Sequence, residues 1–154
     1  MQAIEPQAQH AWLQKLVGEW TYEVGGEEKM SGKEIIRPLG PFWIVGESEF
    51  TMPGGGQGSA RITVGFDPQK GRFVGTWVGS MMTYLWVYDG ELDASGRVLT
   101  LAADGPSMTG DGKTASYEDI IEMVSDDHRL FRARVRGEDG EWQPMMSADY
   151  RRVR

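Results

Sequence analysis

The stretch GRFVGTWVGSMMTYLWVYDG, residues 71–90, decides the fold of this chain. Two runs rich in aromatic and β-branched residues flank Met81-Met82, and this pattern predicts an antiparallel β-hairpin. A turn centred on the two methionines places Trp77 opposite Trp86. Because side chains alternate along a strand, both tryptophans lie on one face of the hairpin.

The same register predicts that aromatic side chains cover glycines on the neighbouring strand. Tyr88 falls opposite Gly75, and Tyr84 falls opposite Gly79. An aromatic ring over a cross-strand glycine shields backbone that would otherwise be exposed, so both pairings are favourable.

The hairpin extends backwards through the turn Asp-Pro-Gln-Lys-Gly at residues 67–71, which sets Phe66 opposite Phe73. One continuous apolar and aromatic face results, made of Ile62, Val64, Phe66, Phe73, Trp77, Tyr84, Trp86 and Tyr88. A slip of one residue would exchange this face with the opposite one, so the face can line an interior or form an exposed interface. We expect it to lie inside.

The rest of the chain repeats short β-type segments cut by glycine, proline and aspartate. We expect ten strands, near residues 19–25, 29–38, 42–52, 58–67, 71–80, 83–92, 97–104, 113–124, 129–137 and 142–152. A single helical pattern covers residues 5–17. A flat sheet of ten strands would leave two unpaired edges, whereas a barrel leaves none. The predicted fold is an all-β, ten-stranded antiparallel barrel in one domain, residues 1–154, with the helix plugging one end.

A second hairpin has its turn at residues 126–128, Asp-Asp-His. If all three residues form the turn, Glu122 falls opposite Arg132 and Glu118 opposite Arg136. Opposite charges then face each other across the strands, which predicts solvated ion pairs rather than an anion-binding site.

Composition restricts the class of partner. The 16 basic and 23 acidic residues give a formal charge of −7, which argues against nucleic acid. No apolar run suits a membrane span, and the first residues lack a signal-peptide pattern. Cysteine is absent, which excludes disulfides and favours the cytoplasm. The 21 glycines beside 16 aromatic residues are typical of a turn-rich β domain.

Both ends of the chain resemble calycin-type barrels such as lipocalins. Gly-Glu-Trp at residues 18–20 resembles the Gly-x-Trp that opens the first strand of those barrels, and Tyr-Arg-Arg at residues 150–152 resembles their closing strand. The resemblance implies that Arg151 or Arg152 packs against Trp20 and ties the first strand to the last, a cation–π contact that contributes about 1 kcal/mol.

A closer resemblance covers nearly the whole chain. The pattern His10-x-x-Leu13-x-x-Leu16, followed by GRFVGTWVGSMMTYLWVYDGELD, LAADGPSM and DGEWQPMMSADYRR, is similar to a bacterial family of small proteins. That family is known as a domain of unknown function, numbered fifteen seventy-nine, and is grouped with lipocalin-like barrels. The resemblance implies the barrel and no established activity, so it assigns no catalytic residue.

Asp119 is the acid of greatest interest, because it alternates with apolar residues and so shares an inward face with Tyr117. A buried aspartate needs a hydrogen-bond partner, which a tyrosine hydroxyl can supply. It either makes a structural hydrogen bond or orients a ligand. The expected ligand-binding residues are Phe66, Phe73, Trp77, Tyr84, Trp86, Tyr88, Tyr117 and Asp119.

Other candidates have simpler interpretations. Glu47 and Glu49 share one face of a strand, either as an acid–base pair or, as we expect, as solvated outer charges. The methionine pairs at residues 81–82 and 145–146 either fill the core, as we expect, or form a flexible rim around a pocket. His10 and His128 have unrelated contexts, so we expect neither a metal site nor haem.

Three functions remain open. We expect a binding protein for a small apolar or aromatic molecule, because a ten-stranded barrel is wider than its own side chains fill easily. One alternative is a small enzyme that uses an interior acid and tyrosines. Another is a scaffold or dimerisation domain with a filled barrel, and the sequence allows a homodimer.

Overall fold

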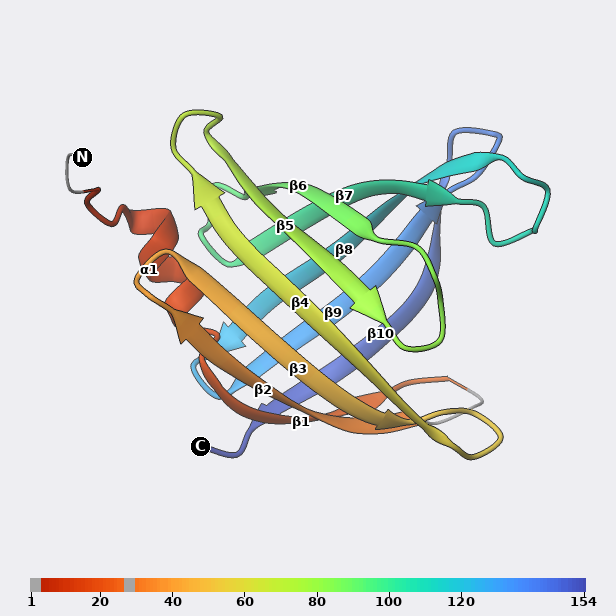
Figure 1. The fold of residues 1–154 in the computed structure, drawn as a ribbon, viewed down its shortest axis with the longest axis horizontal. Helices are drawn as coiled ribbons and strands as arrows, with labels where there is room; N and C mark the ends of the chain where they lie inside the picture. Colours follow the sequence, from red (N-terminus) through yellow and green to blue (C-terminus); the bar gives the residue numbers. More distant parts are fainter. Residues whose placement is uncertain (1–3, 27–29) are drawn as a thin grey trace.

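Ten strands form one closed antiparallel barrel (Figure 1), in a computed structural model that describes residues 4–26 and 30–154. Each strand pairs with its neighbours in the sequence, and the first strand pairs with the last. The elements are α1 (Ala8–Gln14), β1 (Gly18–Val24), β2 (Met30–Leu39), β3 (Trp43–Thr51), β4 (Gln57–Asp67), β5 (Arg72–Gly79), β6 (Trp86–Leu92), β7 (Val98–Pro106), β8 (Thr114–Ser125), β9 (His128–Arg136) and β10 (Trp142–Arg152). The predicted all-β barrel with an N-terminal helix is confirmed.

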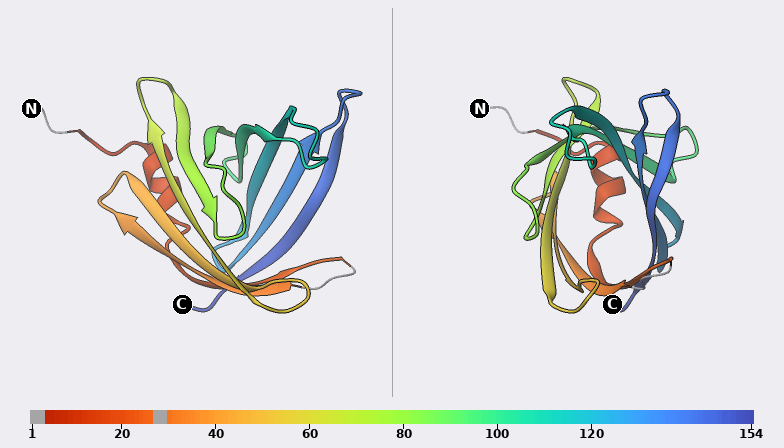
Figure 2. Two further views of the ribbon diagram at one scale, coloured as in Figure 1. Left: turned by 45° about the vertical axis from the view of Figure 1, so that its right-hand side comes forward. Right: turned by 90° about the vertical axis from the view of Figure 1, so that its right-hand side faces the viewer.

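The helix α1 covers one end of the barrel. In the right-hand view of Figure 2, which faces the other end, α1 is seen within the ring of strands. It is shorter than the predicted 5–17, because Gln7 is its N-cap and the chain beyond Gln14 continues as a turn. Its buried side chains include Trp12 and Leu13. The described residues contain no helix long and apolar enough to cross a membrane.

The register of β4, β5 and β6 agrees with the predicted pairs. Phe66 pairs with Phe73, and Trp77 pairs with Trp86. Phe73 and Trp86 are buried, with 2% and 8% of their surface exposed. The aromatic face therefore points into the barrel, as expected.

Tyr84 departs from this face. The chain forms a wide connection at residues 80–85 before β6 begins, so Tyr84 has no pairing with Gly79 and the predicted pair is wrong. The Tyr84 hydroxyl instead donates a hydrogen bond to the Asp104 carbonyl oxygen over 2.9 Å. The indole of Trp86 covers Gly105, where an added Cβ would lie 2.2 Å from the ring. A large ring therefore does cover a glycine on a neighbouring strand, but the residues are Trp86 and Gly105 instead of Tyr84 and Gly79.

The hairpin of β8 and β9 differs from its predicted register by two residues. Its turn contains only Asp126 and Asp127, which shifts the register by one residue, and a bulge at Val124 shifts it by one more. Glu118 therefore pairs with Arg134 rather than Arg136. Because a shift of two residues keeps every side chain on its face, the predicted inner and outer faces remain correct. The outer charges still form ion pairs, Arg132 with Glu122 and Arg134 with Glu118.

The barrel closes around Trp20, which is 1% exposed and pairs across the strands with Arg152. The Arg152 guanidinium lies 4.3 Å from the centroid of the Trp20 ring. Its Nη1 atom donates to the Val17 carbonyl oxygen over 2.6 Å. A Cβ at Gly18 would lie 2.3 Å from that nitrogen, so the close approach of Arg152 requires a glycine at this position, two residues before Trp20. Arg151 points outward and pairs with Asp149.

We expect the substitution Trp20→Ala to lower the free energy of unfolding by about 3–5 kcal/mol, because it leaves a cavity in the core beneath the Arg152 guanidinium. Urea unfolding measures the loss. The neighbouring Thr21→Ala, on the outer face, is the control and should cost less than about 1 kcal/mol. Equal losses for the two variants would contradict a central role for Trp20.

Candidate functional site

The barrel encloses a cavity of about 340 Å³ between α1 and the loops at the open end. This volume lies within the range of about 300–1,000 Å³ that small-molecule sites occupy. All ten strands contribute to its lining, which is mostly apolar. Small side chains, Ala60, Ala103 and Ala133, leave the space that larger residues would fill.

Most of the predicted site residues surround this cavity. Five of them line it: Trp77, Trp86, Tyr88, Tyr117 and Asp119. The rings of Trp86 and Tyr117 meet edge to face, with centroids 4.9 Å apart. These side chains come from β5, β6 and β8 and form an aromatic wall beside one acid.

The other three predicted site residues lie elsewhere. Phe73 packs against Trp12 of the helix, with ring centroids 6.5 Å apart, and Phe66 packs against His10 at 5.7 Å. Both phenylalanines stand near the β4–β5 turn, so they belong to the core beneath α1. Tyr84 lies at the outer rim, 39% exposed. None of the three lines the cavity.

Asp119 is held by Tyr88, whose hydroxyl donates a hydrogen bond to its Oδ2 atom. Burial among apolar side chains raises the pKa of Asp119 from 3.8 to about 6, and the hydrogen bond from Tyr88 partly opposes that rise. Burial and the nearby carboxylate raise the pKa of Tyr88 well above 10.0. The pair therefore combines a neutral hydroxyl with a carboxyl that titrates near neutral pH.

A buried ion pair that was not predicted from the sequence lies deeper in the barrel. The Nη2 atom of Arg129 lies 2.5 Å from Oε1 of Glu34, and both residues are less than a tenth exposed. The Arg129 guanidinium also lies 3.9 Å from the Tyr150 ring centroid and 4.7 Å from that of Trp20. Alternation could have revealed both residues, because Glu34 shares its face with Ile36 and Arg129 shares its face with Phe131.

Tyrosines surround this ion pair. The ring of Tyr22 stacks on Tyr150 with centroids 4.5 Å apart, and its hydroxyl lies 2.8 Å from the Ser48 hydroxyl. Burial raises the pKa values of both phenols. The floor of the cavity is thus polar, in contrast to the mostly apolar walls.

Methionines stand at the mouth of the cavity. Met81, Met82, Met145 and Met146 line it, and all four are at least 36% exposed. The expectation that they fill the core is therefore wrong, and the alternative of a rim is correct. They occupy the β5–β6 connection and the bulged start of β10, where the chain leaves the regular ladder. Flexible thioethers can adapt to a ligand that enters there.

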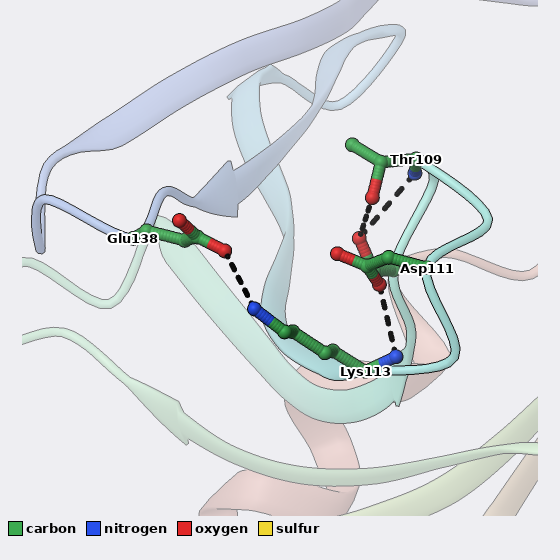
Figure 3. Close-up of polar contacts among 5 residues, drawn as sticks. Thr109, Asp111, Lys113 and Glu138 are labelled. Carbon is green, nitrogen blue, oxygen red and sulfur yellow. Dashed lines mark hydrogen bonds and ion pairs between the residues drawn. The ribbon is translucent and has the colours of Figure 1, made fainter.

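Two loops meet beside this mouth (Figure 3). The Lys113 ammonium, before β8, lies 3.4 Å from the Glu138 carboxylate in the β9–β10 loop. The backbone N–H of Lys113 donates to Asp111 over 2.9 Å, and this bond lowers the pKa of the Asp111 carboxyl. Because both partners of the ion pair are exposed, it holds the loops together only weakly.

The remaining candidates lie outside the cavity. Glu47 is on the outer face, where it pairs with Arg61 over 2.9 Å, and Glu49 is exposed beside it. His128 pairs with Asp149 on the outer face, and His10, a buried residue of α1, has its Nε2 atom 3.0 Å from the Phe66 carbonyl oxygen.

The pH dependence of stability tests the environment of Asp119. Because its pKa is raised, the folded chain holds the proton more tightly than the unfolded chain does. The contribution of Asp119 to stability is therefore greatest below pH 3.8 and is lost as the pH rises through about 6. We expect Asp119→Asn to gain about 1 kcal/mol relative to wild type between about pH 5 and pH 7.5 in urea unfolding.

The outward-facing Glu118→Gln makes the same charge change one residue away and is the matched control. It should show no comparable gain over this pH interval. An Asp119→Asn profile parallel to that of wild type would mean that the carboxyl is well solvated.

Solved structures with the same architecture share little sequence with this chain. The S-type phycobiliprotein lyase CPES from Guillardia theta is 13% identical, with a TM-score of 0.54, over 97% of this chain and 99% of that one. A redesigned β-barrel, b11L5F_LGL, is 12% identical, with a TM-score of 0.52, over 97% and 100%. The barrel EF1p2_mFAP2b bound to DFHBI is 14% identical, with a TM-score of 0.51, over 94% and 99%. These likenesses show the fold alone.

No curated protein matches the chain. A family match, in contrast, covers residues 5–152, from before α1 to the last residue of β10, in agreement with the resemblance seen in the sequence. The chain therefore belongs to the family described as "Protein of unknown function (DUF1579)".

Proposed function

We propose that this protein binds a small apolar or aromatic molecule inside its barrel. The observation that carries the proposal is the cavity of about 340 Å³, with an aromatic wall on one side and a methionine rim at its mouth. Large aromatic surfaces with few polar groups are typical of small-molecule sites.

Similar barrels support this proposal. EF1p2_mFAP2b is bound to the small molecule DFHBI, and the Guillardia theta structure is that of a phycobiliprotein lyase. The DFHBI complex is an example of a similar barrel that accommodates a small molecule, which supports the proposal. The proposed location is the cytoplasm, on the argument that a chain without cysteine needs no oxidising compartment.

The cavity disfavours a purely structural role. A filled barrel would leave no such volume, and the aromatic face that could have formed a dimer interface is turned inward. A homodimer would have to use another surface.

The pair formed by Asp119 and Tyr88 is the arrangement that a small enzyme with an interior acid and tyrosines would use, because the two groups share a hydrogen bond inside the barrel. To donate a proton to a substrate, however, a tyrosine hydroxyl must first be released from its own acceptor. The hydroxyl of Tyr88 already donates to Asp119, that of Tyr117 to the Pro106 carbonyl oxygen and that of Tyr84 to Asp104. Catalysis by these tyrosines would first require these bonds to break.

We expect Trp86→Ala to weaken the binding of the neutral fluorescent probe N-phenyl-1-naphthylamine about tenfold, because the substitution removes a large part of the aromatic wall. A fluorescence titration measures the affinity. The control is Val87→Ala, the next residue, whose side chain faces outward and is 60% exposed. It should bind the probe as wild type does.

A second variant addresses the possibility that Trp86→Ala unfolds. Ala133→Phe fills the cavity from β9 and removes no core contact, so it should abolish probe binding. Size-exclusion chromatography should give one oligomeric state for all variants. Retained binding in both cavity variants, with a changed oligomeric state in Trp86→Ala, would contradict the proposal and make the aromatic face an interface.

A further inference from the structure

We propose that the ligand is a cationic aromatic molecule, such as an aromatic amine or quaternary ammonium ion, whose positive charge pairs with the Asp119 carboxylate inside the barrel. This inference rests on the binding function proposed above and specifies the chemical class of its ligand.

The balance of charge within the cavity is the first argument. Among the described residues, the charged side chains that line the cavity are Glu34, Asp119 and Arg129. Glu34 and Arg129 neutralise each other at 2.5 Å. Asp119 makes no ion pair within the described part of the chain, and its hydrogen-bond partner Tyr88 is neutral. The ionised cavity therefore carries one negative charge that a ligand can neutralise.

The state of Arg129 is the second argument, because it decides against an anionic ligand. Arg129 is 2% exposed, its guanidinium lies over the rings of Trp20 and Tyr150, and Glu34 binds it. The Nε atom has no hydrogen-bond partner within residues 4–26 and 30–154, but it is buried and so offers no accessible donor to a ligand. A carboxylate ligand would find its natural partner already occupied and would be repelled by Asp119.

The surroundings of Asp119 are the third argument. Across the strands it faces Leu101 and Ala133, and the small alanine leaves space in front of the carboxyl. Tyr117 precedes it on the same face, and Trp86 packs against Tyr117. Aromatic rings attract a cation through their electron-rich faces, and a nearby carboxylate adds a full charge to that attraction.

The proton on Asp119 competes with such a ligand. With a pKa of about 6, the carboxyl is mostly ionised at pH 7.5 and mostly neutral at pH 5. The titratable and charged groups that act on this region are Tyr88 from β6, Tyr150 from β10, and the paired Glu34 and Arg129 from β2 and β9. The formal charge of −7 also favours the approach of cations.

The test compares two probes of the same shape, the cation benzyltrimethylammonium and its neutral carbon isostere neopentylbenzene. Isothermal titration calorimetry gives the affinity of wild type, Asp119→Asn and the control Glu118→Gln. We expect Asp119→Asn to weaken cation binding at least about tenfold and to change binding of the neutral isostere by less than about twofold. Glu118→Gln, whose side chain faces outward, should bind both probes as wild type does.

A second arm uses wild type alone, so it does not depend on whether the variant folds. Lowering the pH from about 7.5 to about 5 should weaken cation binding roughly tenfold, because most of the Asp119 carboxyl becomes protonated, and should leave the neutral isostere unchanged. The shift of about 1.4 kcal/mol that corresponds to tenfold is well within the range of calorimetry.

The outcomes separate this inference from the binding function. If the neutral isostere binds but the cation does not, or if cation binding ignores both Asp119→Asn and pH, the inference is overturned while the binding function stands. If wild type binds none of the three probes, benzyltrimethylammonium, neopentylbenzene and N-phenyl-1-naphthylamine, the binding function fails and the inference fails with it.

Discussion

The pairing of β1 with β10 is the interaction on which the rest of the structure depends. It joins the two ends of the chain, and the Arg152 guanidinium over Trp20 fixes this seam beside the start of the barrel. Once the sheet is closed, each side chain must face either the interior or solvent, because alternation along a strand allows nothing else. The same arginine bonds to the carbonyl oxygens of Lys15 and Val17, so it also positions the segment after the helix.

Closure creates two kinds of buried charge with different consequences. Glu34 and Arg129 pair with each other and with aromatic rings, and they close the polar floor of the cavity. Asp119 receives one neutral hydrogen bond and faces open space, so its ionisation is sensitive to whatever occupies that space. The contrast separates a floor whose charges serve the structure from a wall that the proposed ligand would contact.

The fold could be predicted because its signals are local. Alternation in residues 71–90 and the turns around them determine which side chains share a face. Even in β8 and β9, where the predicted register is wrong by two residues, each side chain lies on its predicted face. The site was only partly predictable. Trp86 and Asp119 follow from alternation, but the place of Phe66 depends on where the helix rests, which no local pattern encodes. Similarly, the pairing of Glu34 with Arg129 joins residues that are 95 positions apart, so it arises only when the barrel closes.

The central claim is that the interior of this barrel is a binding site. A crystal structure of the protein soaked with N-phenyl-1-naphthylamine tests it most directly. The account predicts one probe molecule inside the barrel, with its rings against Trp86 and Tyr117 and its edge near Asp119. A probe bound only on the outer surface, with the cavity empty or filled by rearranged side chains, would contradict it.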